Sequence, residues 1–464
     1  MTGIKPAAWA AAVAALLGGC AVPAPPYERP PAPVAADFPG GAGAGLAASE
    51  IAWQDYYADA RLRRLIDLAL AGNRDLRAAV LAIEQARALY QVRRADELPT
   101  VNAAATATRQ PNASGGIGST YTAGLALASY EIDLFGRVRN LSDAALAQYF
   151  ATEEARKAAQ ISLLAAVATT HLSLLADDEL LAVTRQTLAT REESLRLTRL
   201  RLANGAASEL DVRLAESLDE GARATLAQQL RQRALDENAL VLLVGQPLPA
   251  DLPPATPLAE QPLRADLPSG VPSQVLARRP DVRQAEQQLI AANANIGAAR
   301  AAFFPRISLT GSVGLASTHL SDLVQAGSFA WSIAPQLLLP IFDSGRNQAN
   351  LEGAQVNREI LLAQYERSVQ SAFREVADAL AGRATLGEQL RAQQAQANAE
   401  AVRARLADLR YRNGASSLLE VLDAQRSLFA ARQAMVQVLV ARAQNGVALY
   451  KALGGGWSAD APAP

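Results

Sequence analysis

Two stretches of the chain can sustain helices of unusual length. No proline occurs between Pro111 and Pro247, nor between Pro340 and Pro462, and proline is the residue that most reliably breaks a helix. Residues 137–203 contain neither glycine nor proline, which predicts one helix of about 100 Å. Apolar side chains recur there every seven residues, at Val167, Leu174, Leu181, Leu188, Leu195 and Leu202. This strict period predicts a left-handed supercoil against neighbouring helices.

Each long helix is predicted to reverse at an Asn-Gly pair and to return as a second helix. Asn204-Gly205 and Asn413-Gly414 supply the positive φ angles that a tight reversal needs. Beyond the first pair, apolar residues step by four along the chain, at Leu214, Leu218, Ala222, Leu226, Leu230 and Ala234. The prediction is therefore two helical hairpins, over residues 137–244 and 345–452.

Four shorter segments alternate apolar with small or polar residues, the pattern of strands that present two different faces. They are residues 307–316 and 329–339, with weaker versions at 101–109 and 121–134. Each has about the 9–11 residues that a tilted transmembrane strand requires. Loops rich in Gly, Ser and Asn join each pair, which predicts β-hairpins over 101–134 and 306–340 with loops at 110–120 and 317–328.

Four strands are too few to close a barrel, and open sheet edges are not tolerated in lipid. The strands therefore predict an oligomer in which each copy donates two hairpins to one barrel. A soluble four-stranded sheet is the alternative that the pattern alone leaves open.

The two halves of the chain repeat one plan. Gly136-Arg137 recurs as Gly345-Arg346, and both Asn-Gly pairs share the same offset of 209 residues. Ser208 and Ser417, also 209 residues apart, are placed to cap the returning helices. A repeat of this length indicates a duplicated domain. The predicted organisation is a signal peptide (1–19), a Pro/Gly-rich linker (20–50), a first repeat (51–250), a connector (251–270), a second repeat (271–453) and a flexible tail (454–464).

Composition excludes several classes of protein. The 464 residues include 44 Lys and Arg against 45 Asp and Glu, a net charge of −1, which argues against nucleic-acid binding. Alanine, a strong helix former, accounts for 101 residues. Two histidines and one cysteine exclude a disulfide framework and Cys-rich zinc sites. No phosphate-binding loop, HExxH motif or nucleophile elbow is present, so no enzyme, catalytic residue, cofactor or metal is predicted.

The N-terminus has the pattern of an export signal. Lys5 precedes an apolar run over 7–17, which is too short to span a bilayer and is typical of a secretory signal peptide. Leu17-Gly18-Gly19-Cys20 resembles the bacterial lipobox, which implies that Cys20 is lipidated. An ordinary signal peptide with a chance cysteine is the alternative.

Six groups of residues, in this order and spacing, resemble the TolC-like outer membrane efflux factors. The closest resemblance is to their lipoprotein (NodT-type) branch, which serves resistance–nodulation–division pumps. The groups are Trp53 with Leu65, Ile66, Leu70 and Asn73; residues 133–137; Arg279-Pro280-Asp281; residues 301–305; residues 411–414; and residues 419–425. The resemblance covers nearly the whole chain after the signal peptide.

The resemblance implies an α+β membrane protein that forms a trimer. Its twelve-stranded outer membrane β-barrel would continue as a periplasmic α-helical barrel, anchored by lipid in a Gram-negative bacterium. The chain is then expected to be the passive exit duct of a tripartite efflux system, with a periplasmic adaptor and an inner membrane pump as partners. A lipid-anchored periplasmic coiled-coil adaptor and the exit duct of a type I polypeptide secretion system are the alternatives.

The resemblance also implies the sites. The turns Asn204-Gly205 and Asn413-Gly414 would be the periplasmic tips that contact the adaptor. The family closes its channel next to the second tip, and the matching residues are Tyr411, Leu419, Glu420 and Asp423, with Leu210 and Asp211 from the first repeat. Three copies of Glu420 and Asp423 would form a ring of negative charge that favours cations, and their mutual repulsion is expected to raise at least one pKa.

Overall fold

The computed structural model describes residues 24–39, 48–111, 115–262, 267 and 276–457. The predicted signal peptide, Cys20 and residues 458–464 of the predicted tail lie outside this range. Contacts divide the chain into two compact units, and both repeats contribute to each. The units comprise the described residues of 1–32, 81–154 and 283–368 (unit 1) and of 33–80, 155–282 and 369–464 (unit 2). The units cross the repeat boundaries because the hairpins of both repeats join a single sheet.

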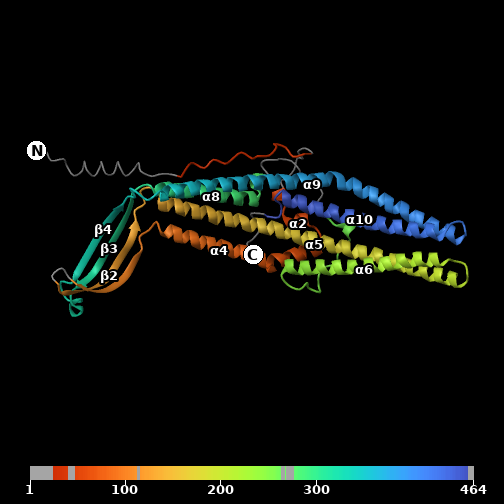
Figure 1. Ribbon diagram of the computed structural model, residues 1–464, viewed down its shortest axis with the longest axis horizontal. Helices are drawn as coiled ribbons and strands as arrows, with labels where there is room; N and C mark the ends of the chain where they lie inside the picture. Colours follow the sequence, from red (N-terminus) through yellow and green to blue (C-terminus); the bar gives the residue numbers. More distant parts are fainter. Residues whose placement is uncertain (1–23, 40–47, 112–114, 263–266, 268–275, 458–464) are drawn as a thin grey trace. The chain divides into compact units, whose positions relative to one another are not determined.

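Unit 1 holds an antiparallel four-stranded sheet in the order β1-β2-β3-β4 (Figure 1). Its strands are β1 (Val101–Pro111), β2 (Ile117–Glu131), β3 (Arg306–Ser317) and β4 (Phe329–Leu338). The short helix η3 (Leu320–Asp322) lies in the loop between β3 and β4. The first hairpin differs from its prediction at both ends. Its strands extend into the expected loop 110–120, and β2 ends at Glu131 because residues 132–134 form the turn into the next helix.

Cross-strand pairs give the sheet one apolar face and one face of small or polar residues. Val313 on β3 pairs with Leu125 on one side and with Trp331 on the other. Trp331 is 69% exposed, so the described residues leave the apolar face uncovered. Hydroxyl pairs mark the opposite face, with oxygens 2.6 Å apart in Thr106–Thr122 and 2.8 Å apart in Ser312–Ser332.

The seam between the two hairpins depends on a pair of glycines. Gly124 on β2 lies directly opposite Gly314 on β3. A Cβ atom on Gly124 would lie 2.3 Å from the carbonyl oxygen of Val313, and one on Gly314 would lie 2.3 Å from that of Ala123. The backbones therefore approach more closely here than a side chain permits.

The strands pass into the long helices through the same turn in both repeats. Gly136 (φ 78°) and Gly345 (φ 83°) adopt left-handed backbone just before each helix. Asp133 Oδ2 accepts a hydrogen bond from the first turn of one helix at 2.8 Å, and Asp343 Oδ2 does so for the other at 2.9 Å. A carboxylate at a helix N-terminus satisfies free backbone N–H groups.

Four long helices form the two predicted helical hairpins. They are α5 (Arg137–Ala203), α6 (Glu209–Val244), α9 (Arg346–Arg412) and α10 (Leu418–Ala452). The shorter helices are η1 (Ala48–Glu50), α2 (Trp53–Tyr56), α3 (Ala60–Gly72), α4 (Arg74–Ala95), η2 (Leu258–Glu260) and α8 (Pro280–Ala301). The range of α5 coincides with the stretch that lacks glycine and proline.

The seven-residue repeat on α5 forms a seam that is buried or half-buried except next to the turn. Val167, Leu181 and Leu195 are buried, whereas Leu202, next to the turn, is exposed. In the described part of the chain α5 is the one helix long and apolar enough to cross a membrane, with a window of mean hydropathy 1.5. Half of that window is buried inside the chain, as expected for a helix that packs against other helices.

The core of unit 2 gathers residues that are distant in sequence. Tyr56 stacks on Tyr450 with ring centroids 4.0 Å apart, and Tyr57 meets Tyr450 edge-on. The Tyr450 hydroxyl donates to the carbonyl oxygen of Ile51 at 2.6 Å. The Arg279-Pro280-Asp281 motif has a structural role. The buried Arg279 donates a hydrogen bond to the carbonyl oxygen of Ala452, the last residue of α10, at 2.9 Å.

The described part of the Pro-rich N-terminal segment is packed, in contrast to the linker expected from its composition. Within unit 1, Arg29 donates to both carboxylate oxygens of Glu286 on α8 at 2.6 and 2.7 Å, and Asn293 donates to the carbonyl oxygen of Pro25. Within unit 2, Phe38 stacks on Phe373. Composition indicated a linker and did not reveal the partners, such as Glu286, that hold this segment.

Gly124→Ala should prevent the two hairpins from joining, because its Cβ would clash with the backbone of β3. We expect a large loss of protein in the heat-modifiable oligomeric form on SDS gels. The control is Gly118→Ala on the same strand, whose Cβ would meet its nearest heavy atom at 3.9 Å. Equal yields of oligomer from both variants would contradict the role of the glycine pair.

Candidate functional site

The two turns predicted as tips have the same local structure. Gly205 (φ 70°) and Gly414 (φ 72°) take the left-handed conformation after α5 and α9. The side-chain amides of Asn204 and Asn413 each donate to a carbonyl oxygen of the last helical turn at 2.7 Å. These bonds satisfy carbonyl groups that a helix C-terminus leaves without partners. The Asn-Gly pairs thus close both reversals in the way that their residue types predict.

The returning helices begin at the predicted serine caps. Ser208 and Asp211 form a reciprocal capping box at the start of α6, and the hydrogen bond from Ser208 lowers the pKa of Asp211. Ser417 Oγ accepts from the backbone N–H of Glu420 at 3.4 Å at the start of α10. Asp211 therefore has a structural role at its helix terminus.

The hairpins share an apolar core close to the turns. Leu195 of α5, Val212 and Ala215 of α6, and Leu418 and Leu422 of α10 form one buried cluster. The α5–α6 hairpin is thereby fixed against the start of α10.

Tyr411 occupies the junction of this core. Its half-buried side chain packs against the cluster above and against a second one formed by Ala407, Val421 and Ala424. The guanidinium of Arg201 lies over its ring, 4.6 Å from the centroid. Tyr411 thus packs α9 against the α5–α6 hairpin and against α10.

The two leucines predicted for the gate point away from that core. Leu210 is 68% exposed and Leu419 is 60% exposed. They are equivalent positions of the two repeats, 209 residues apart. An exposed leucine at both positions marks a surface that the described chain leaves uncovered.

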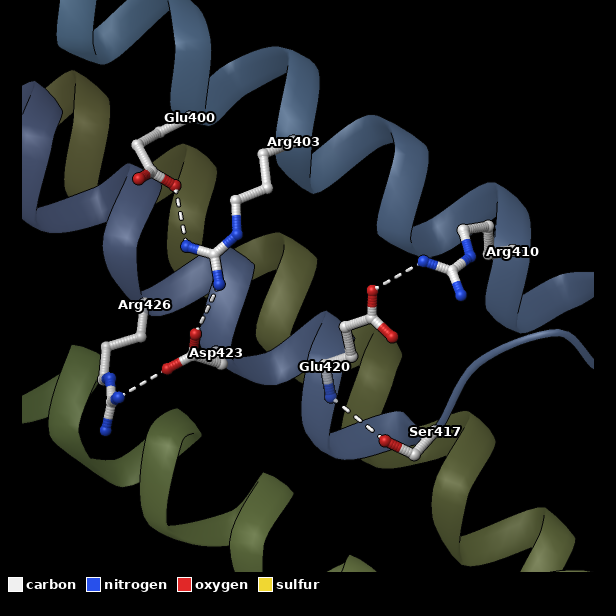
Figure 2. Close-up of polar contacts among 7 residues, drawn as sticks. All are labelled: Glu400, Arg403, Arg410, Ser417, Glu420, Asp423 and Arg426. Carbon is white, nitrogen blue, oxygen red and sulfur yellow. Dashed lines mark hydrogen bonds and ion pairs between the residues drawn. The ribbon is translucent and has the colours of Figure 1, made fainter.

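Glu420 and Asp423 are paired with arginines of their own chain (Figure 2). Arg410 Nη1 on α9 lies 3.1 Å from Glu420 Oε1, and Arg403 Nη2 lies 2.6 Å from Asp423 Oδ2. Arg426 on α10 holds the second oxygen of Asp423 at 2.5 Å. Two of these pairs join α9 to α10.

These arginines set the electrostatics of the acids within one chain. The hydrogen bond from Arg403 and the charges of Arg403 and Arg426 lower the pKa of Asp423. The repulsion expected to raise a pKa acts between copies of the chain, so that rise and the cation preference stay predictions. One feature of the sequence pointed to these arginines, because Arg410 occupies the position in the second repeat that Arg201 occupies in the first. The partner of Arg410, Glu420, lies on a different helix, so this spacing could not identify it.

The remaining chemistry of the described residues is sparse. No group of three or more His, Cys, Asp or Glu among them could hold a metal ion. His171 is buried on α5 with Nε2 3.8 Å from Asp59 Oδ2, and His319 is exposed in the β3–β4 loop. Asp59 caps α3, so the first histidine lies in a structural setting.

Comparisons with known proteins agree on one family. The family model described as "Outer membrane efflux protein" matches residues 65–246 and 271–455. Outer membrane protein OprJ of Pseudomonas aeruginosa is 48% identical over 96% of this chain and 95% of its own length. The solvent efflux pump outer membrane protein SrpC of Pseudomonas putida is 46% identical, with coverage of 96% and 97%.

Solved structures give the same result. The open state of the Neisseria gonorrhoeae MtrE outer membrane channel has a TM-score of 0.86 at 44% identity, and the match covers 93% of this chain and 98% of that one. A Pseudomonas aeruginosa membrane protein has a TM-score of 0.87 at 48% identity, with coverage of 94% and 97%. This chain belongs to the outer membrane efflux protein family, whose members are channels of the Gram-negative outer membrane.

Proposed function

We propose that this chain is the exit duct of a tripartite efflux system, a passive channel through which a pump and its adaptor expel small molecules across the outer membrane. The observation that carries the proposal is the direct passage of an apolar-faced sheet into 67-residue helices in both repeats. A sheet that can face lipid, joined to helices long enough to line a periplasmic tunnel, suits conduction. The family description and the name of SrpC favour efflux over polypeptide secretion.

Closure of the barrel requires other copies of the chain. The outer edges of β1 and β4 pair with no strand among the described residues, and unpaired edges are too costly in lipid. Pairing β4 of one copy with β1 of the next gives a closed barrel, and three copies give twelve strands. The fold therefore supports the trimer that the family resemblance implies.

Two exposed apolar stripes support the same closure. In unit 1, α4 leads into β1 and exposes Leu89 and Val92, while α9 follows β4 and exposes Val356 and Ile360. Joining β4 of one copy to β1 of the next brings these helices of neighbouring copies together. Each stripe then covers the other, which removes apolar surface from water.

We place the anchor at Cys20 and the partners at the tips. A diacylglyceryl group with a third acyl chain provides stable attachment where one chain gives only marginal binding. Near the turns, Leu197 and Leu200 on α5 and their repeat equivalents Leu406 and Leu409 on α9 are exposed. These apolar pairs beside Asn204-Gly205 and Asn413-Gly414 offer the adaptor a contact surface in each repeat.

The resting channel is closed at the periplasmic end by three copies of Leu419. Tyr411 and the buried clusters hold the start of α10 in place. The pairs Arg403–Asp423 and Arg410–Glu420 tie α10 to α9, so the gate opens only when these ties give way. Leu210 and Asp211 contribute the equivalent surface from the first repeat.

Purified protein in planar lipid bilayers should give discrete conductance steps, because a closed barrel encloses an aqueous path. The matched control is the Gly124→Ala variant, which should give none. A folded wild-type protein that remains soluble without detergent and electrically silent would contradict the channel and favour the adaptor alternative.

Arg403→Gln should raise the resting conductance about two- to fivefold, because exposed ion pairs are individually weak but this one joins two helices. Single-channel recording of the variant against wild type measures the effect. Arg374→Gln is the control, since among the described residues Arg374 pairs with Asp378 on its own helix. A resting conductance equal to that of wild type would show that the pair does not hold the gate.

A further inference from the structure

A cavity of about 400 Å³ lies in unit 1, where the strands pass into the long helices. Its volume is within the range of roughly 300–1,000 Å³ that is typical of small-molecule sites. Apolar side chains line it, among them Ile132, Phe304 and Leu338, together with the three arginines Arg137, Arg306 and Arg346. The cavity therefore combines apolar surface with positive charge.

Two of these arginines share one carboxylate. Arg137 donates to both oxygens of Glu131, at 2.8 and 2.7 Å, and Arg306 Nε lies 2.6 Å from Glu131 Oε2. The side chain of Glu131 is only 10% exposed. Two arginines and one glutamate leave a net charge of +1, and each guanidinium has five N–H donors. Donors therefore remain for a second anion.

The third arginine lacks such a partner. Arg346 occupies the position in the second repeat that Arg137 occupies in the first, 209 residues earlier. The residue equivalent to Glu131 is Pro340, which offers no carboxylate. Arg346 forms no ion pair within the described part of the chain, and its side chain is exposed. A guanidinium without a carboxylate is thus placed at the cavity.

The two other acids that line the cavity are bound to helix N-termini. Asp133 Oδ2 accepts from the backbone N–H of Arg139 at 2.8 Å. Asp343 accepts from the backbone N–H groups of Gly345 and Asn347 at 3.0 and 2.9 Å. The partial positive charge of each helix N-terminus offsets these carboxylates, so the arginines remain available to an anion.

The length of β4 gives the depth of the cavity in a membrane. Its 10 residues extend about 33 Å along the strand, and a tilt of about 40° leaves a height of about 25 Å, that of the apolar band of a transmembrane barrel. Leu338, the last residue of β4, lines the cavity. In the proposed channel the cavity therefore lies at the edge of the band, where lipid headgroups begin.

Two strongly exposed apolar side chains follow β4. Ile341 is 93% exposed and Phe342 is 88% exposed, and in the chain they stand between the cavity residues Pro340 and Asp343. Transfer of apolar surface from water to an apolar environment is favourable. An acyl chain beside the cavity would supply that environment.

We propose that the cavity binds the phosphate group of a glycerophospholipid. Arg346 and the pair Arg137–Arg306 are its cationic ligands, and an acyl chain lies against Ile341 and Phe342. The guanidinium fork matches the geometry of phosphate, and basic pockets at a membrane surface bind lipid headgroups. The phosphate site stands on the cavity and its arginines, whereas its depth in the membrane rests on the proposed function.

The test is native mass spectrometry of the full-length protein, purified in detergent and titrated with dioleoylphosphatidylglycerol. Wild type should bind the lipid with one high-affinity site per chain. Arg346→Gln should weaken that affinity about tenfold or more, because it removes charge-assisted hydrogen bonds. Arg139→Gln is the matched control, since Arg139 is an exposed arginine in the first turn of the other long helix and does not line the cavity. It should bind as wild type does.

Two further ligands identify what is recognised. Dioleoylglycerol, which has the same acyl chains without the phosphate, should not occupy the site, and equal binding of it would overturn the phosphate claim. Inorganic phosphate at equal concentration should not displace the lipid, and full displacement would show a site for free phosphate instead. Equal lipid affinity of wild type and Arg346→Gln would also overturn the proposal.

Conductance in planar bilayers separates this site from the proposed function. A conducting protein whose lipid binding does not depend on Arg346 would reject the site and leave the channel standing. A silent protein with Arg346-dependent binding of phospholipid would reject the channel and leave the phosphate site standing.

Discussion

The outer edges of β1 and β4 carry backbone N–H and C=O groups that have no partner among the described residues. In water such an edge can be solvated, but in lipid every backbone group must be paired. The rest of the structure is consistent with this single constraint. It accounts for the uncovered apolar face and for the apolar stripes on the helices that precede β1 and follow β4. It is also the reason why we propose a ring of copies.

The second feature on which the structure depends is the duplication of one plan within the chain. Each repeat contributes one β-hairpin and one helical hairpin, and the sheet joins the two β-hairpins through the close approach of Gly124 and Gly314. The repeats are equivalent at their turns and serine caps. Arginine–carboxylate pairs join the two helices of each hairpin, Arg199–Glu216 in the first repeat and Arg403–Asp423 in the second.

Sequence patterns predicted the features that depend on local chemistry. The stretch without glycine or proline located α5, and the Asn-Gly pairs and serines located the turns and caps. Packing partners could not be predicted. Arg403 and Asp423 are 20 residues apart on different helices, and a carboxylate read without its arginine appears as a free charge. The same limit made residues 24–39 resemble a linker, because Glu286 is more than 250 residues away from Arg29.

The closed ring of copies is the central claim, and disulfide cross-linking across the β4–β1 seam tests it most directly. A cysteine at Thr106 on β1 would be combined in turn with one at Ser332, Ala334 or Gln336 on β4, and oxidised in native outer membranes. The account predicts that one register gives covalent species that end at three chains. A ladder that continues beyond three chains, or monomers alone from every pair, would contradict it.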